Sequence, residues 1–186
     1  MIPLMYWKIQ QQRKIAAEAR SIQVNRLETG YCNIPHYKKA YKGGEDAWIT
    51  SDSLIAVADG VGGWNKKGVD PGIFARELCA HVNRRFKAWL TWKERYEIDL
   101  WELLVQSVKE TEATGTSTFV MALLDAEDPH LRTLNLGDSG FIILRADSEG
   151  KLKSVFRSEE KQHRFNNPYQ CGTNHKLPYM ADVYLH

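Results

Sequence analysis

A strand that ends in a glycine-rich loop is encoded by Leu54-Ile55-Ala56-Val57-Ala58-Asp59-Gly60-Val61-Gly62-Gly63-Trp64. The apolar run before Asp59 is typical of a buried strand. Asp59 therefore puts a carboxylate at the end of that strand, where a charge is unfavourable unless something positive meets it. A hard divalent cation suits this position because it takes oxygen ligands. The alternative interpretation is that Asp59-Gly60 is only a turn signal.

The residues before this run complete a predicted hairpin. Residues 43–50 have the pattern of a strand, and Ser51-Asp52-Ser53 is a turn cluster. If the hairpin is centred on Asp52, Glu45 lies opposite Asp59, where like charges repel. Two converging acids need a cation or a shared proton. A slip of one residue in this assumed register would turn Glu45 to the other face of the sheet.

Two helices are predicted after the glycine loop. Asp70-Pro71 combines an N-cap with a proline suited to the first helical position. Apolar residues then recur at helical spacing from Phe74 to Phe86. A second stripe covers residues 100–108, with Asp99 as its cap, and the short link between the stripes predicts antiparallel neighbours.

Further strands are predicted after the helices, in an antiparallel meander over residues 117–124, 131–136, 141–145 and 152–156. Strands, then helices, then strands indicate the α+β class, with helices laid over antiparallel sheets. The turn Gly137-Asp138-Ser139-Gly140 offers Asp138 as a second candidate metal ligand. Aspartate between glycines is also typical of a tight turn, so both interpretations stay open.

Composition limits the classes of function. With 186 residues, 43% of them hydrophobic, the chain suits one domain with a substantial core. A formal net charge of +2 provides no basic field for nucleic acid, and no apolar run is long enough to span a bilayer. Cys32, Cys79 and Cys171 are odd in number and widely spaced, which favours a reducing compartment and argues against disulfides or a zinc site.

Several motifs follow one another in the order of a known family: Gly44-Glu45-Asp46-Ala47, Asp59-Gly60-Val61-Gly62-Gly63-Trp64, Gly115-Thr116-Ser117-Thr118 and Asn135-Leu136-Gly137-Asp138-Ser139-Gly140. With them the chain resembles the metal-dependent serine/threonine protein phosphatases of the type 2C class. It is most similar to the mitochondrial-type subgroup, which shares Val61, Trp64, Val69-Asp70-Pro71 and a stretch like residues 162–170. The resemblance runs from about Gly43 to Gln170.

This resemblance implies an antiparallel β-sandwich flanked by helices, with two Mg²⁺ or Mn²⁺ ions and a third, weaker one. It implies that Asp59 bridges two ions, that the Gly60 carbonyl binds one and Glu45 the other, and that Asp46 holds a metal-bound water. Asp138 matches an acid that helps hold the additional ion. Asp59 and Glu45 would be the catalytic residues, and a metal-activated water would hydrolyse phosphoserine or phosphothreonine in a phosphoprotein substrate.

The chain departs from the family pattern at two places near this site. Val61 stands where many relatives have a histidine that is a candidate general acid. Protonation of the leaving group would then depend on metal-bound water or on His163, for which a structural or surface role is the alternative. Many relatives also bind the phosphate with an arginine before the Glu-Asp pair, and here Lys38, Lys39 or Lys42 would serve.

The resemblance also divides the chain into three parts. Residues 1–29 form an N-terminal extension whose basic character is weakly that of a mitochondrial targeting segment, or of an ordinary surface helix. Residues 30–170 form a partial phosphatase domain, and residues 171–186 form a divergent tail without the family's downstream aspartate motifs. We therefore expect a C-terminally truncated phosphatase, mitochondrial or alternatively cytoplasmic. The competing expectation is an impaired fragment that binds phosphoproteins or other partners.

Overall fold

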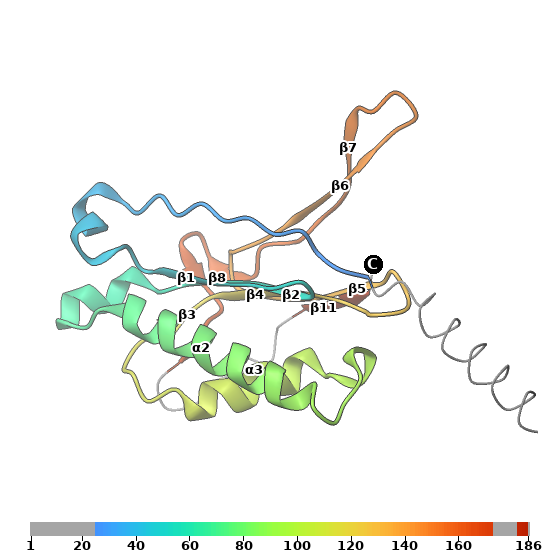
Figure 1. The fold of residues 1–186 in the computed structure, drawn as a ribbon. Helices are drawn as coiled ribbons and strands as arrows, with labels where there is room; N and C mark the ends of the chain where they lie inside the picture. The colour runs from blue at the N-terminus through green and yellow to red at the C-terminus, as the bar shows by residue number, and fades with distance from the viewer. Residues whose placement is uncertain (1–24, 173–181, 186) are drawn as a thin grey trace, which may run out of the picture.

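The computed structural model describes residues 25–172 and 182–185, which form an α+β fold. Its largest sheet is antiparallel and five-stranded, and two long helices, α2 and α3, cover one face of it (Figure 1). The predicted class, helices laid over antiparallel sheets, is confirmed. In the order β1-β2-β4-β5-β11, the strands of this sheet are Asp46–Thr50, Leu54–Asp59, Phe119–Leu124, Leu131–Leu136 and Asp182–Leu185.

Both long helices begin at the residues that their capping signals predicted. Helix α2 (Pro71–Trp89) starts after Asp70, whose carboxylate accepts a hydrogen bond of 3.0 Å from the Gly72 amide. Helix α3 (Leu100–Glu110) starts after Asp99, which accepts a hydrogen bond of 3.0 Å from the Glu102 amide. These side chains satisfy amide groups that have no partner inside the helix. Both predicted starts are confirmed.

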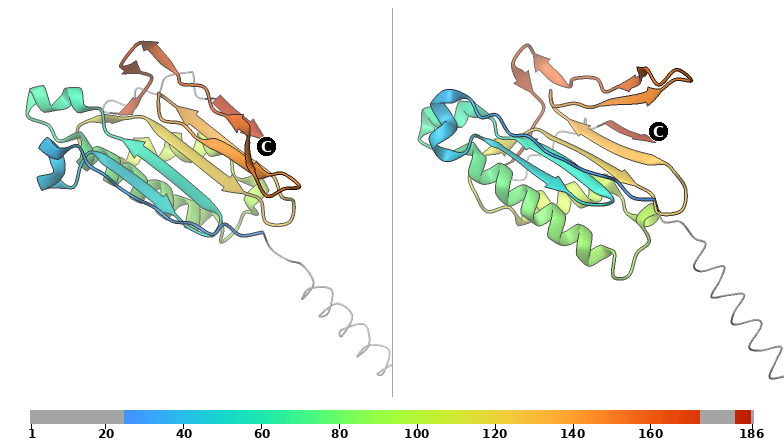
Figure 2. Two further views of the ribbon diagram at one scale, coloured as in Figure 1. Left: turned by 90° about the horizontal axis from the view of Figure 1, so that it is seen from above. Right: turned by 45° about the horizontal axis from the view of Figure 1, so that its top comes forward.

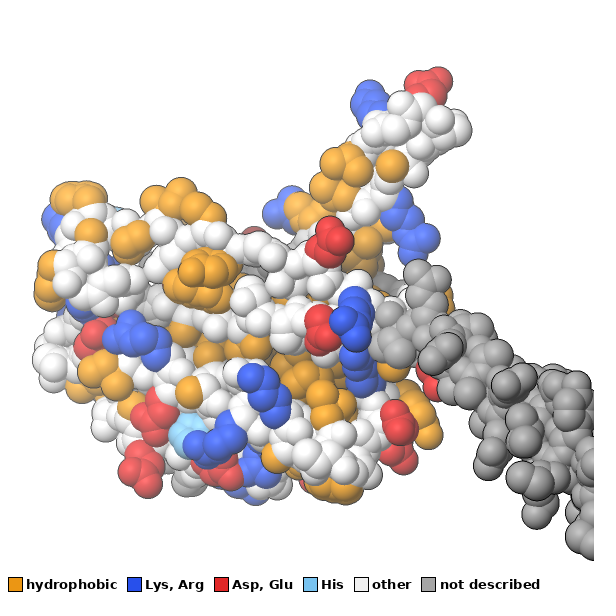
Figure 3. Space-filling model, viewed as in Figure 1, with side chains coloured by type: hydrophobic (Ala, Val, Ile, Leu, Met, Phe, Trp, Pro, Cys, Tyr) orange, Lys and Arg blue, Asp and Glu red, His pale blue; other side chains and the backbone are white. Residues whose placement is uncertain are grey.

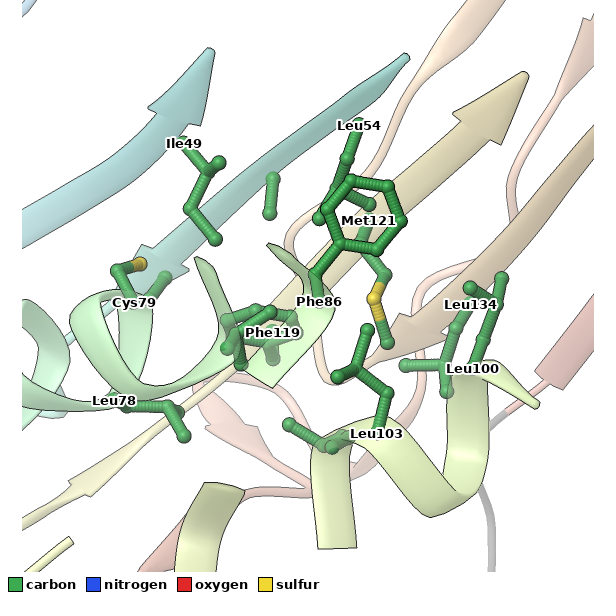
Figure 4. Packing of buried hydrophobic residues seen from close by; sticks show 14 of the residues in the cluster. Ile49, Leu54, Leu78, Cys79, Phe86, Leu100, Leu103, Phe119, Met121 and Leu134 are labelled. Atoms are coloured by element: carbon green, nitrogen blue, oxygen red, sulfur yellow. The ribbon is translucent and has the colours of Figure 1, made fainter. Parts of the chain in front are cut away.

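The hydrophobic core lies between the helices and the sheet. Strand β2 alternates, with Leu54, Ala56 and Ala58 buried and Ile55, Val57 and Asp59 exposed, so one face of the sheet packs on the helices. Figure 4 shows side chains from both helices meeting those of the strands. Labelled there are Ile49, Leu54, Leu78, Cys79, Phe86, Leu100, Leu103, Phe119, Met121 and Leu134, all of them buried.

A separate hairpin, β6–β7, rises on the side of the sheet opposite the helices (Figures 1 and 2). Strands β6 (Ile142–Ala146) and β7 (Leu152–Arg157) pair only with each other in the described part of the chain. The predicted continuous meander is therefore wrong after β5. The chain leaves the sheet at Gly137, whose φ is +103°, and a Cβ there would lie 2.6 Å from Thr118 Cγ2. Only glycine fits such a position without strain.

The second face of the large sheet is partly open. A groove of about 610 Å³ lies along it, between residues 27–34, the exposed side chains of β2 and the start of β6. Val57 keeps 44% of its surface exposed, and Leu144 and Leu152 on the hairpin keep 51% and 63%. Hydrophobic side chains are visible along the projecting hairpin in Figure 3. The hairpin β6–β7, which lies on this side, is thus much smaller than the five-stranded sheet.

Short elements complete the described fold. Part of the predicted divergent tail is built into sheets, because β10 pairs with β3 and β11 pairs with β5; the predicted domain boundaries stay a prediction. No helix in residues 25–172 combines the length and apolar character that a membrane crossing requires. The remaining elements are η1 (Tyr37–Lys42), η2 (Gly62–Lys67), η3 (Arg95–Glu97), β3 (Thr116–Ser117), β8 (Gln162–Arg164), β9 (Asn167–Pro168) and β10 (Cys171–Gly172).

Candidate metal centre

Asp46 is the residue that lies opposite Asp59 across the β1–β2 ladder. The predicted pairing of Glu45 with Asp59 is wrong by one residue. The cause is the turn, where Ser51 Oγ accepts hydrogen bonds from the Ser53 and Leu54 amides and donates one of 2.9 Å to the Leu54 carbonyl. This side chain closes the loop around a point between Asp52 and Ser53. A shift of one residue exchanges the two faces of a strand.

Three acidic residues gather at this end of the sheet. Asp46 and Asp59 alternate with the buried Ala47 and Ala58, so their side chains face away from the helices. Although Asp59 keeps solvent-exposed surface, partial desolvation raises the pKa of its carboxyl group to about 6. The negative charges of Asp46, Asp138 and Glu45 and a hydrogen bond with Asp46 are the other causes of this raised pKa. Among residues 25–172, no ion pair joins a positive side chain to Asp46, Asp59 or Asp138, so the cluster holds like charges together.

Glu45, the residue just before β1, has a different environment. It is only 6% exposed, and its carboxylate accepts hydrogen bonds from Lys39, from Lys42 at 3.1 Å and from Asn65 at 2.6 Å. Burial alone would raise the pKa of Glu45, but the hydrogen bonds from Lys39, Asn65 and Lys42 outweigh it and lower the pKa. Glu45 is not the cross-strand partner of Asp59, but its negative charge contributes to the raised pKa of Asp59, and its role as a metal ligand stays a prediction.

Lys42 links this carboxylate to the start of helix α2. Its ammonium lies 2.7 Å from Asp70 Oδ1, the same oxygen that caps the helix, and 3.2 Å from Asn65 Oδ1. Arg76 approaches Asp70 at 3.5 Å. The sequence identified Asp70 as a cap, but nothing in it paired Asp70 with a lysine 28 residues earlier. Asn65, which contacts both Lys42 and Glu45, was missed for the same reason.

Gly60 packs tightly against the helix start. Its amide donates a hydrogen bond of 3.0 Å to the Glu45 carbonyl. A Cβ at Gly60 would lie 2.6 Å from the Pro71 carbonyl oxygen and 2.8 Å from that of Glu45, closer than real side chains come. The motif therefore needs glycine here, because backbone atoms of two other segments occupy the space.

The glycine loop is fixed on its far side by Thr116. The Val61 amide donates to the Thr116 carbonyl at 2.9 Å, and the Trp64 indole donates to the Thr116 hydroxyl at 2.7 Å. This hydroxyl is hydrogen-bonded in turn to Gln170. Trp64 and Thr116 belong to quoted motifs, but their mutual contact was not predicted.

The acidic cluster suits oxygen-seeking cations by its donor type. In residues 25–172 no three carboxylate, imidazole or thiol side chains meet closely enough to surround one ion by themselves. Magnesium is commonly bound by one or two carboxylates together with waters and substrate phosphate, so a pair such as Asp46 and Asp59 fits that mode. The His163 ring packs against the Tyr169 ring with a tilt of 54° and a centroid distance of 4.0 Å, and in the described region no hydrogen bond or ion pair joins His163 to the acids.

Comparison with solved structures gives the class of the fold. The chain matches a structure described as the photosystem II phosphatase PBCP, with a TM-score of 0.68 and 31% identity over 82% of this chain and 58% of that one. The fold is thus that of a phosphatase domain. No family model matches the sequence.

Curated relatives give the family. A relative named "Probable protein phosphatase 2C 80" from Arabidopsis thaliana is 38% identical over 88% of this chain. The "Protein phosphatase PTC7 homolog fig" of Drosophila willistoni is 37% identical over 74% of it. The chain belongs to the type 2C protein phosphatase family, as the motifs predicted. It spans 38% and 44% of the length of these two relatives.

Proposed function

We propose that this chain carries the metal-binding part of a serine/threonine protein phosphatase that uses Mg²⁺ or Mn²⁺. The observation that carries the proposal is the gathering of Asp46, Asp59 and Asp138 at one end of the sheet. Their charges raise the pKa of Asp59, and a divalent cation would relieve this repulsion. Membership in the type 2C family supports the same chemistry.

In this proposal Asp59 and Asp46 hold the ions, with Asp138 and the Gly60 carbonyl as further oxygen donors. The ions, when bound, would activate water and neutralise charge on the phosphoryl group. The main contribution of Glu45 is structural, because its hydrogen bonds hold Lys39, Lys42 and Asn65 beside the glycine loop. Lys39 is the best-placed lysine for a substrate phosphate, since its side chain is 35% exposed and Lys42 is 14% exposed.

The mitochondrial location belongs to the same proposal. Its support is the resemblance to the mitochondrial-type subgroup and the basic first twenty residues, which lie outside the described residues. A fusion of residues 1–29 to a fluorescent protein tests it: import into mitochondria supports the location, and diffuse cytoplasmic fluorescence contradicts it.

The activity is tested by Mn²⁺-dependent hydrolysis of p-nitrophenyl phosphate by the purified chain. We expect Asp59→Asn to abolish turnover and Asp52→Asn to leave it unchanged, because Asp52 lies in the turn at the opposite end of the hairpin. Folded protein without turnover at any Mn²⁺ concentration would overturn the phosphatase proposal. The alternative would then be a binding module that recognises phosphoproteins without hydrolysing them.

A further inference from the structure

A group of lysines borders the acidic cluster on two short helices. We call Lys38, Lys39 and Lys42 of η1 together with Lys66 and Lys67 of η2 the lysine collar. Helix η1 ends just before the Glu45-Asp46 pair, and η2 begins three residues after Asp59. The collar is therefore fixed to both strands that carry the acids.

Side-chain contacts hold the two halves of the collar together. Asn65 of η2 accepts a hydrogen bond of 3.2 Å from Lys42 of η1 and donates one of 2.6 Å to Glu45. Each helix ends at a glycine in the left-handed conformation, Gly43 with φ +80° and Gly68 with φ +74°. The geometry of the collar is thus set by the fold, although the lysine side chains lie at the surface.

The collar carries more positive charge than the chain itself neutralises. Lys39 and Lys42 are paired with Glu45, and Lys42 also with Asp70. Lys38, Lys66 and Lys67 are exposed, and no ion pair joins them to an acid within residues 25–172. Three of the five lysines are therefore left without a carboxylate partner in this part of the chain, and bound divalent ions would compensate the neighbouring charges of Asp46, Asp59 and Asp138.

Aromatic rings support two of the lysines without an acid partner. The Lys67 ammonium lies 4.6 Å from the centre of the Trp64 ring, and the Lys38 ammonium lies 5.6 Å from that of Tyr37. Such contacts favour an ammonium that stays charged and ordered at the surface. The same Trp64 is hydrogen-bonded to Thr116, which anchors it to the sheet. These two ammonium groups are accordingly available to an acidic partner beside the site.

We propose that the lysine collar selects phosphoprotein segments that carry aspartate or glutamate next to the phosphorylated residue. This inference rests on the proposed phosphatase function and specifies its substrate class. Exposed charges act over about 8 to 10 Å in physiological salt, which covers a few residues on either side of a bound phosphate. Acidic flanks meet the excess positive charge, and basic flanks are repelled by it.

The test compares two phosphopeptides of equal length, one with acidic and one with uncharged flanks. We expect wild-type protein to prefer the acidic peptide by about tenfold in kcat/KM, since each exposed ion pair contributes a factor of about two. The double variant Lys66→Gln/Lys67→Gln should reduce this preference to about threefold, and added salt should shrink it in the wild type. Activity on the uncharged peptide should not change.

The matched control is Lys87→Gln/Lys109→Gln, which removes the same charge from exposed positions on α2 and α3. It should retain the wild-type preference. An equal loss in the control, or an equal rate on both peptides in the wild type, would overturn the inference. Circular dichroism of each variant excludes unfolding as the cause.

A binding measurement separates this inference from the phosphatase proposal. Fluorescence anisotropy with labelled peptides in EDTA reports selection without turnover. Selective binding of the acidic peptide that depends on Lys66 and Lys67, together with no hydrolysis when Mn²⁺ is supplied, would sustain the inference and overturn the enzyme. Hydrolysis of both peptides without preferential binding of the acidic one would sustain the phosphatase proposal and overturn the inference. Tighter binding of a single-stranded oligonucleotide or of an anionic vesicle than of the acidic phosphopeptide would also overturn the inference.

Discussion

Asp46 lies opposite Asp59 across the β1–β2 ladder, while Glu45, one residue earlier and just before β1, is bound by two lysines. One end of a single hairpin therefore carries two kinds of acid. The charge of Glu45 is compensated by the chain. The charges of Asp46 and Asp59 are not, and directly opposed like charges destabilise a strand pair. A cation from solution would compensate the charges of Asp46 and Asp59.

Removing one of the opposed charges should stabilise the metal-free protein. Because the pKa of Asp59 is about 6 in the fold and 3.8 is its ordinary value, the folded state holds this proton more tightly. Stability should therefore fall as the pH rises from about 4 to about 6 and stay lower above that range. In EDTA at about pH 8, we expect Asp59→Asn to exceed the wild type by about 1 kcal/mol, because solvent screens this partly exposed group.

Urea unfolding at several pH values measures this difference, which should shrink toward about pH 4. Addition of Mn²⁺ should then raise the Tm of the wild type and leave that of Asp59→Asn unchanged, because only ligands that bind the native state stabilise it. A variant less stable than the wild type in EDTA would show that the Asp59 charge is compensated after all.

Gly60→Ala should damage the site through packing alone. The new Cβ would lie within 2.8 Å of backbone atoms of Glu45 and Pro71, so strand and helix must move apart. We expect a loss of about 1 to 3 kcal/mol in the free energy of unfolding, with weaker Mn²⁺ binding. Gly63→Ala is the control, because a Cβ there meets nothing within 4 Å. Equal stability of the two variants would contradict the close packing.

Lys42→Gln should destabilise the fold, because it removes the positive partner of Glu45 and Asp70 together. Leaving largely buried carboxylates without that partner should lower the free energy of unfolding by about 2 kcal/mol. Lys38→Gln on the same short helix removes an exposed charge and should change stability by less than about 0.5 kcal/mol. Thermal or urea unfolding of both variants checks this. If Lys42→Gln leaves the free energy of unfolding unchanged, Lys39 and Asn65 are sufficient to compensate the charge of Glu45.

The cysteines should react in two classes. Burial raises the pKa of Cys79 and of Cys171 to about 12, whereas Cys32 is exposed. Native protein should therefore release about one equivalent with a thiol reagent, and unfolded protein about three, because the thiolate is the reactive form. Cys32→Ser should abolish the fast reaction. Rapid labelling of that variant in its native state would show that the buried segments open.

Local signals predicted much of the fold. Asp70 and Asp99 mark helix starts through hydrogen bonds that reach only two or three residues, so the sequence alone identifies them. Strand β2 and the glycine loop after it follow from equally local signals, but the exposure of Ile55 and Val57 on one face of that strand was not predicted. Because Asp59 is the last residue of this strand, its place at that end of the sheet was predictable as well.

Tertiary structure decided the rest of the candidate site. The hydrogen bonds of the Ser51 hydroxyl close the hairpin turn in a register that places Asp46, and not Glu45, opposite Asp59. Lys42 and Asp70 meet across 28 residues, and Trp64 and Thr116 across 52. The departure of the chain after β5 depends on the space left around Gly137 by Thr118 and Tyr169. Spacing in a sequence specifies which side chains share a strand or helix face, but contacts between distant segments depend on packing that no short pattern encodes.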